Sequence, residues 1–244
     1  MRFCFIKLCR LIFLSLTFPL HLLDVMGLCC PYKRLFPLLV YNSTFSYNHK
    51  MHNIKRGLFR NVVRFANTDG SLRLLEIGCG SGANLRFYPY GSSVTCTDPN
   101  PHFERYLRMS MAANKHLTYE KFLSVPGEDM RGIEDESVDV VVGTLVLCSV
   151  NNVQKVLQEV RRVLRTGGAF YFLEHVVSDS STWTYFFQYI FEPVWYYLGD
   201  GCIVTRTTWK DLEAAGFAEL HLRHIEAPEV SLMIRPHIVG YSIK

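Results

Sequence analysis

One short stretch constrains the fold of this 244-residue chain more than any other. Residues 74–82 read Leu-Leu-Glu-Ile-Gly-Cys-Gly-Ser-Gly, an apolar run that ends in Glu76 and three alternating glycines. This pattern predicts a buried strand that turns sharply into a helix, where backbone N–H groups can approach a ligand closely. A second apolar run, residues 93–97, leads to Asp98, whose carboxylate is suited to accept hydrogen bonds from both hydroxyls of a ribose. The stretch therefore predicts a site for a ligand that carries an adenosine.

The glycine pattern leaves the identity of that ligand open. Gly78, Gly80 and Ala83 also satisfy the dinucleotide fingerprint GxGxxG/A. The nicotinamide and flavin cofactors of oxidoreductases therefore compete with S-adenosylmethionine at this point. A glycine-rich turn without any ligand is the third alternative.

Positive charge is concentrated near the N-terminus. Residues 1–65 hold ten of the 26 Lys and Arg residues and one of the 22 acidic residues, which leaves 16 basic and 21 acidic side chains, a net charge of −5, for residues 66–244. A domain with that charge is poorly suited to bind phosphates, so nucleic acid is not an expected substrate. The basic segment favours an anionic membrane surface instead.

The spacing of the cysteines along the sequence does not indicate a metal site. The chain has eight of them, with no CxxC pair and no Cys/His cluster at metal-ligand spacing. We therefore expect no metal, and a reducing compartment is the simplest environment for these thiols.

Residues 11–28 form the longest apolar run, but Pro19, His21 and Asp24 interrupt it. A spanning helix needs about 20 apolar residues, and basic residues on both sides leave the orientation unset. We expect a helix that lies in the membrane interface, or a re-entrant hairpin with residues 35–40 as its second arm. A cleaved signal peptide is the alternative, although no A-x-A-like site follows the run.

The remaining chain divides into a linker and a larger domain. Residues 1–45 are the expected membrane anchor with its basic flank, and residues 46–70 are the expected linker. Apolar residues recur over 46–66 with a period close to 3.6, which predicts an amphipathic helix there. Helix and strand patterns then alternate over residues 71–244, which predicts an α/β domain with a doubly wound, mostly parallel sheet. Strands are expected at 72–77, 93–97, 117–123, 138–142, 169–173, 219–224 and 237–243, and helices from Gly82 and at 103–114, 152–164 and 208–215.

Three later segments favour S-adenosylmethionine over the other cofactors. They are residues 125–130 (VPGEDM), 135–142 (DESVDVVV) and 163–170 (VLRTGGAF). Their order after the glycine loop resembles the class I S-adenosylmethionine-dependent methyltransferases. The resemblance implies the Rossmann-like fold of that class, with seven strands of which the last is antiparallel, and S-adenosylmethionine as the cofactor.

A closer resemblance covers nearly the whole chain. The matching segments resemble the methyltransferase-like seven family of membrane-anchored alkyl thiol S-methyltransferases. This resemblance implies an enzyme at the cytosolic face of the endoplasmic reticulum membrane and on lipid droplets that methylates exogenous thiols and hydrogen sulfide, and the aromatic segment described below favours a small lipophilic thiol. One departure is Thr166, where the family pattern usually has Pro. The segments are residues 17–20 (TFPL), 87–89 (FYP), 98–101 (DPNP), 144–150 (TLVLCSV), 174–175 (EH), 200–202 (DGC) and 235–238 (RPHI).

The resemblance also implies roles for single residues in cofactor binding. The methionine end of the cofactor would lie over the three glycines, and its ribose on Asp98. Glu128 and Asp129 would face the adenine, although Pro126 stands where an acid is often found, and Thr144 would lie beside the sulfonium. The predicted cofactor-binding set is Glu76, Gly78, Cys79, Gly80, Gly82, Asp98, Asn100, Glu128, Asp129 and Thr144.

Methylation of a thiol also needs an acceptor for its proton. A thiol with a pKa near 8.5 is mostly protonated at neutral pH. His175, predicted at the C-terminal end of a strand, is the first candidate for the base, and Asp200 is the second. The alternative is that His175 has only a structural role. Residues 183–197 include nine aromatics and are expected to form a substrate lid within 178–205, or else to pack in the core or against lipid.

Other functions stay open at this point. A lipid or isoprenoid acceptor is the main alternative to a thiol, and a catalytically weak scaffold on lipid droplets is another. The intact glycine loop and Asp98 argue against the scaffold, because a protein that binds no cofactor need not keep the loop open.

Overall fold

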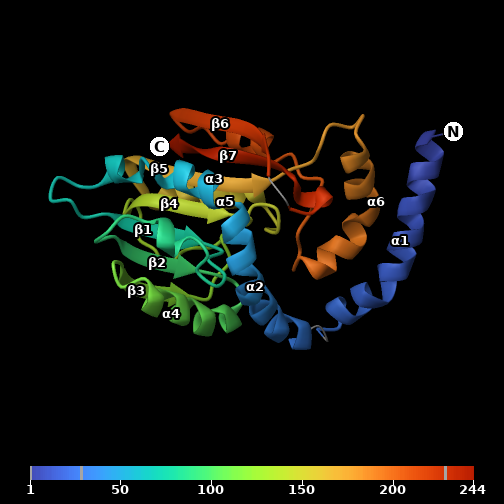
Figure 1. Ribbon diagram of the computed structural model, residues 1–244, viewed down its shortest axis with the longest axis horizontal. Helices are drawn as coiled ribbons and strands as arrows, with labels where there is room; N and C mark the ends of the chain where they lie inside the picture. Colours follow the sequence, from blue (N-terminus) through green and yellow to red (C-terminus); the bar gives the residue numbers. More distant parts are fainter. Residues whose placement is uncertain (1, 28–29, 228–229) are drawn as a thin grey trace.

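Seven strands form one sheet in the computed structural model, which describes residues 2–27, 30–227 and 230–244 (Figure 1). The strand order is β3-β2-β1-β4-β5-β7-β6, in which β1 to β5 pair in parallel and β7 runs antiparallel to both neighbours. This confirms the predicted Rossmann-like sheet and its antiparallel last strand. The strands are β1 (Arg73–Ile77), β2 (Ser93–Thr97), β3 (Thr118–Leu123), β4 (Val138–Thr144), β5 (Leu164–His175), β6 (Glu219–Glu226) and β7 (Pro236–Ile243).

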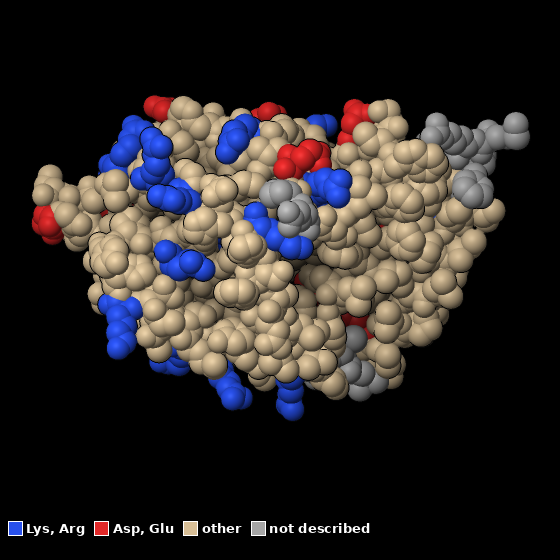
Figure 2. Space-filling view, in the orientation of Figure 1, with Lys and Arg blue, Asp and Glu red and all other residues tan. Residues whose placement is uncertain are grey.

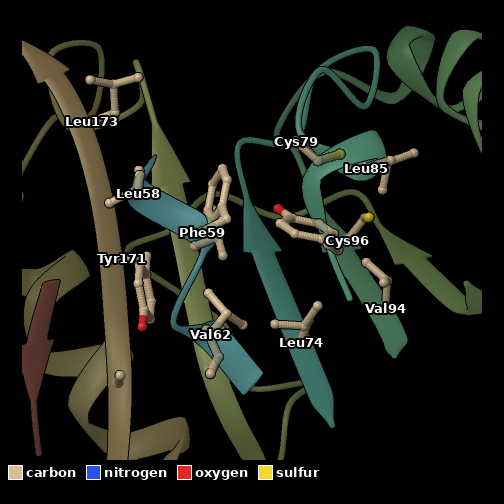
Figure 3. Packing of buried hydrophobic residues seen from close by; sticks show 14 of the residues in the cluster. Leu58, Phe59, Val62, Leu74, Cys79, Leu85, Val94, Cys96, Tyr171 and Leu173 are labelled. Carbon is tan, nitrogen blue, oxygen red and sulfur yellow. The ribbon is translucent and has the colours of Figure 1, made fainter. Parts of the chain in front are cut away.

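Helices cover both faces of the sheet. Successive strand residues point to opposite faces, so Leu74 of β1 packs in one core and Leu75 in the other. The first core includes Phe59 (Figure 3) and residues of α4, and the second includes residues of α5 and α7. The helices are α1 (Arg2–Val25), α2 (Cys30–Lys50), α3 (His52–Phe59), α4 (Glu104–Ala113), α5 (Val153–Val163), α6 (Trp183–Leu198) and α7 (Thr208–Ala214), with short 3-10 helices η1 (Val62–Phe65), η2 (Leu85–Phe87), η3 (Pro101–Phe103) and η4 (Leu232–Ile234).

The helix expected from Gly82 is wrong. Turns and the short η2 follow the glycine loop, and Tyr88 then adopts an extended conformation with φ −78° and ψ 150°. Pro89 disfavours a helical conformation at the residue before it, so a helix starting at Gly82 has no room to form. The loop after β1 is therefore held by side-chain hydrogen bonds rather than by a helix.

The single helix expected over residues 46–66 is also wrong. α2 ends at Lys50, α3 covers His52–Phe59, and η1 covers Val62–Phe65. The breaks let the chain bury Met51, Phe59 and Val62 against the sheet, which one straight helix does not do. Side chains of α2 bond to the glycine loop, and α3 bonds to α2, so both helices lie next to the loop.

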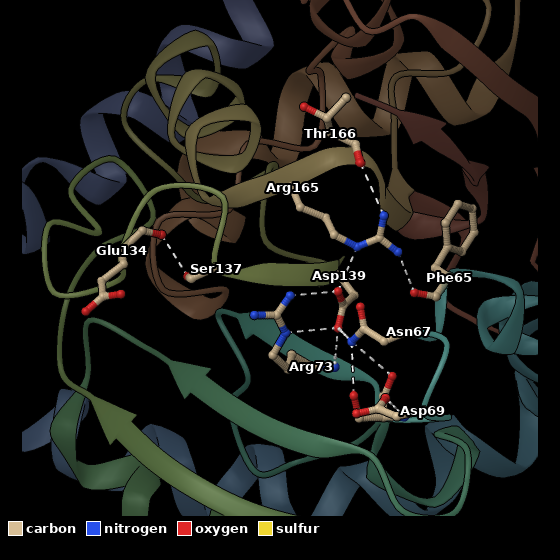
Figure 4. Close-up of polar contacts among 10 residues, drawn as sticks. Phe65, Asn67, Asp69, Arg73, Glu134, Ser137, Asp139, Arg165 and Thr166 are labelled. Carbon is tan, nitrogen blue, oxygen red and sulfur yellow. Dashed lines mark hydrogen bonds and ion pairs between the residues drawn. The ribbon is translucent and has the colours of Figure 1, made fainter.

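A buried carboxylate joins the N-terminal ends of three strands (Figure 4). The side chain of Asp139 on β4 is fully buried and accepts hydrogen bonds from the guanidinium groups of Arg73 (2.9 Å) and Arg165 (2.8 Å) and from Asn67 (3.1 Å). Burial opposes its ionisation, but Arg73 and Arg165 outweigh burial and hold the pKa of Asp139 below its usual range. The cluster fixes the sheet end opposite to the predicted site.

The N-terminal helix α1 packs along α6 at one side of the domain (Figure 1). Arg10 donates a hydrogen bond to Glu192 at 2.8 Å, and the rings of Phe13 and Phe191 lie 4.6 Å apart. Within the described residues, Ile6–Val25 is the one stretch long and apolar enough to cross a membrane by length and composition, and most of it is exposed. The part of the molecule that contains α1 and α6 carries few charged side chains in Figure 2.

Candidate active site

The glycine loop follows β1 and needs glycine at its turning points. Gly78, Gly80 and Gly82 have φ values of 54°, 51° and 80°, a region that disfavours other residues. A Cβ atom on Gly78 would also lie 2.5 Å from a methyl group of Val146. The loop therefore passes directly beneath the segment that follows β4, and Cys79 is buried within it.

Asp98, at the end of β2, closes the other side of the loop. One of its carboxylate oxygens accepts a hydrogen bond from the backbone N–H of Gly80 (3.0 Å), and the other accepts one from Asn100 (2.9 Å). Asp98 is 6% exposed, and burial raises its pKa to about 6. The structure thus brings together Asp98, Asn100 and the glycine loop, as the sequence predicts.

Glu76 and Thr144 meet through Asn84, a residue that sequence reasoning missed. The Asn84 amide donates hydrogen bonds to Glu76 (2.8 Å) and to the Thr144 hydroxyl (2.9 Å), while Tyr88 donates to the second oxygen of Glu76 (2.8 Å). The side-chain oxygen of Asn84 is buried and has no partner in the described residues. An unpartnered buried polar atom beside the loop fits a site that is completed by a ligand.

Lys55 of α3 is a second residue that the sequence pattern did not single out. It is 1% exposed and donates a hydrogen bond to Asn48 (2.8 Å), which in turn donates to the Ala83 carbonyl of the loop (2.7 Å). Burial lowers the pKa of Lys55 to about 7 and raises that of Glu76 to about 7. No carboxylate of the described residues lies within ion-pair distance of the Lys55 ammonium group. Since a buried cation needs an anionic partner, the position fits an anionic ligand group.

Glu174 lies at the carboxyl end of β5. One of its oxygens accepts hydrogen bonds from the backbone N–H groups of Val146 (2.9 Å) and Leu147 (3.1 Å), and the other is buried without a partner in the described chain. Burial raises the pKa of Glu174 to about 8. The hydroxyl of Tyr47 is likewise buried without a partner in the described residues, and burial, together with the charge of Glu174, raises its pKa. The polar groups of the loop and of β5 thus form one buried region beneath α2.

His175 follows Glu174 and faces two thiols. Its Nε2 atom lies 3.0 Å from the Cys202 sulfur, and one donor atom each of Cys148, His175 and Cys202 lies within 4.8 Å of the other two. His175 is 2% exposed. Burial disfavours its charged form, but Cys148 and Glu174 outweigh this effect and raise the pKa of His175. Its role as the base stays a prediction, tested by the turnover of His175→Ala between about pH 6 and 9.

Two predicted site residues, Glu128 and Asp129, pair with groups outside this region. Glu128 accepts hydrogen bonds from the backbone N–H groups of Asn151 (2.7 Å) and Asn152 (3.1 Å), and Asp129 pairs with Arg131 at 2.6 Å. Their contact with an adenine therefore stays a prediction. Burial raises the pKa of Asp98, and the charge of Asp200, which follows α6, adds to that rise, so the role of Asp200 as a base stays a prediction.

Comparisons with known proteins agree with this geometry. Residues 75–172 match the family model described as a methyltransferase domain. The chain is 50% identical to human thiol S-methyltransferase TMT1B over 98% of both chains, and 53% identical to human thiol S-methyltransferase TMT1A over 87% of both. The fold is similar to that of a putative methyltransferase from Bacillus halodurans, with a TM-score of 0.56 and 18% identity over 76% of this chain and 98% of that chain.

Proposed function

Because the chain belongs to the thiol S-methyltransferase family of S-adenosylmethionine-dependent enzymes, we propose that it methylates small lipophilic thiols at the surface of a membrane. The observation that carries this proposal is the position of the site. The buried polar region at the carboxyl ends of β4 and β5 lies next to α6, and α6 in turn packs on the apolar helix α1. A substrate dissolved in a membrane would meet this side of the enzyme first.

The proposed cofactor site uses the residues that the structure brings together. Bound S-adenosylmethionine supplies an activated methyl group on a sulfonium. Asp98 would hold the ribose hydroxyls, and the backbone of the glycine loop would hold the methionine end. Glu76 and Asn84, fixed to Thr144, would complete the polar surroundings. These residues mainly align the two reactants and exclude water, which lowers the barrier for methyl transfer by several kcal/mol.

Lys55 would neutralise the carboxylate of the cofactor's methionine group. Lys55→Met keeps the apolar stem and removes the charge, so we expect KM for S-adenosylmethionine to rise by about 30-fold or more, as for loss of one partner in a buried charge pair. Unfolding should not become easier, because within the described residues no carboxylate pairs with this ammonium group. Steady-state kinetics and a thermal melt measure both effects. Lys115→Met, at an exposed position, is the matched control, and an unchanged KM in Lys55→Met would contradict the role.

Membrane attachment through α1 would put the enzyme at the cytosolic face of the endoplasmic reticulum and on lipid droplets. The side chains of Leu11, Leu16 and Phe18 are 58%, 66% and 56% exposed, and Trp183 of α6 adds an exposed aromatic ring. Because α1 packs along α6, it would lie in the membrane interface rather than stand across the bilayer. Glu192 also accepts hydrogen bonds from Thr205, so the anchor would be joined to the lid and to the loop that follows it.

A flotation experiment tests the membrane surface. Full-length enzyme should float with vesicles of zwitterionic and anionic lipids, and a variant with Leu11, Leu16 and Phe18 replaced by Asn should bind at least about 100-fold more weakly, since each buried side chain is worth about 1.5 kcal/mol or more. The three residues are exposed, so cofactor binding should not change. Equal flotation of both proteins would contradict the proposed surface.

The substrate proposal is tested with a panel of acceptors and isotopically labelled S-adenosylmethionine. In vesicles, hexanethiol and other alkyl thiols should yield labelled thioethers, and hydrogen sulfide should yield labelled methanethiol. Glutathione should react at least about tenfold more slowly, because the aromatic side chains of α6 do not compensate its charges. Label in an isoprenoid or lipid oxygen, with none in thioethers, would favour the alternative substrate class.

A further inference from the structure

Three soft donor atoms converge at the carboxyl ends of β4 and β5, although they are far apart in sequence. Cys148 lies in the loop after β4, His175 ends β5, and Cys202 follows α6. All three are buried, and their donor atoms lie within 4.8 Å of one another. It is the one such group of three or more candidate ligands among the described residues. Methyl transfer from a sulfonium does not by itself require this arrangement.

We propose that Cys148 Sγ, His175 Nε2 and Cys202 Sγ form a binding site for one thiophilic cation of the Zn²⁺ class. Zn–S bonds of about 2.3 Å and Zn–N bonds of about 2.0 Å place tetrahedral donor atoms about 3.5–3.8 Å apart. The observed separations, including 3.0 Å between His175 and Cys202, need shifts of about 1 Å or less. Small changes of side-chain torsion achieve this without moving the backbone.

The surroundings match the charge of such an ion. On binding, each thiol loses its proton, and two thiolates balance the two charges of Zn²⁺, so the filled site is neutral and tolerates burial. The indole N–H of Trp195 already donates to the Cys202 sulfur at 3.2 Å, a contact that supports a thiolate. Thiolate and imidazole donors select this class of ion over Mg²⁺ and Ca²⁺, which prefer oxygen.

The backbone holds the ligands in place before any ion arrives. The N–H of Ile203 donates to the Cys148 carbonyl at 3.0 Å, so the loops that carry the two thiols are joined directly. The fourth coordination position is left for water, for the unpartnered oxygen of Glu174, or for a substrate thiolate. A bound ion would fasten the segment after α6 to the sheet.

The test uses full-length enzyme in mild detergent with a phosphine reductant, stripped of metal and titrated with Zn²⁺ against a chromophoric chelator. We expect one ion per chain, release of protons, and a thermal midpoint that rises with Zn²⁺ but not with Mg²⁺. Co²⁺ in place of Zn²⁺ should give the intense visible bands of a tetrahedral thiolate site. Cys148→Ser and Cys202→Ser should each weaken binding by about 100-fold. Cys96→Ser, which removes a buried thiol elsewhere, should leave it unchanged.

A second measurement needs no variant and covers the case in which a variant fails to fold. Zn²⁺ should slow alkylation of Cys148 and Cys202 in the native enzyme, but not that of the partly exposed Cys9. Absence of one-to-one binding, wild-type Zn²⁺ affinity in either Ser variant, or a Cys148–Cys202 disulfide in place of free thiols would overturn the proposal. Because none of these readouts is methyl transfer, a failure of the metal site and a failure of the predicted base at His175 are distinguishable.

Discussion

Asp98→Ala lowers kcat/KM for S-adenosylmethionine by about 100- to 1,000-fold, because the ribose loses two charge-assisted hydrogen bonds worth about 1.5–2 kcal/mol each. The variant also leaves the N–H groups of Gly80 and Asn100 without their carboxylate partner, so the loop closes less firmly on its ligand. Binding to vesicles should not change, since the proposed membrane surface is formed by exposed apolar side chains of α1 and Asp98 is buried. Asp98→Asn separates size from charge and should show a smaller loss.

The same residue sets an acid limit on cofactor binding. The ionised form of Asp98 accepts the hydrogen bonds, and burial raises its pKa to about 6, with a smaller contribution from Asp200. Without the cofactor, the raised pKa of Asp98 means that protonation of this carboxyl group stabilises the folded state as the pH falls. Binding of S-adenosylmethionine instead requires the ionised carboxylate. KM for S-adenosylmethionine should therefore rise as the pH falls through about 6. A flat profile from pH 5 to 8 in the wild type would contradict this assignment.

Asp139→Ala destabilises the enzyme by about 2–4 kcal/mol, the second large effect that the structure predicts. The substitution removes a fully buried carboxylate that accepts five hydrogen bonds, and it leaves the backbone N–H of Arg73 without a partner. Both guanidinium groups stay partly exposed and keep their hydration, which limits the loss. Chemical denaturation in detergent measures it. Glu104→Gln, in an exposed pair with Arg108, should change stability by no more than about 0.5 kcal/mol.

The pH dependence of stability has a definite sign here. The folded-state pKa of Asp139 lies below its ordinary value, so its contribution is present above the range where unfolded aspartate titrates and is lost as the pH falls through the lower folded-state pKa. The free energy of unfolding of the wild type should therefore exceed that of Asp139→Asn at neutral pH, and this difference should disappear at acid pH. A constant difference from neutral to strongly acid pH would show that the ion pairs do not supply the stability.

Local sequence patterns predict most of the sheet and the centre of the cofactor site. The glycine loop and Asp98 are close in sequence and are built from residues whose backbone preferences are strong, so their neighbourhood follows from short-range rules. The alternation of segments likewise predicts all seven strands, with ends that shift by a few residues at β5. These features depend on periodicity and turn chemistry, which a single sequence contains.

The remaining features depend on tertiary contacts. Pro89 prevents the helix after Gly82, and the burial of Met51 breaks the amphipathic helix, because local periodicity does not reveal what the segment packs against. In the sequence, Lys55 is one of several basic residues in its segment. Only the packing of α3 beside the glycine loop shows that its side chain is buried. Cys148 and Cys202 are each 27 residues from His175, so no spacing rule connects them.

Isothermal calorimetry with S-adenosylhomocysteine tests the central claim most directly, because it asks whether the loop and Asp98 hold the adenosine group independently of any acceptor. Full-length wild-type enzyme should bind one ligand per chain, Asp98→Ala should lose at least about 100-fold in affinity, and NADH should not compete. Absence of binding to the wild type, or equal affinity in both proteins, would contradict the account.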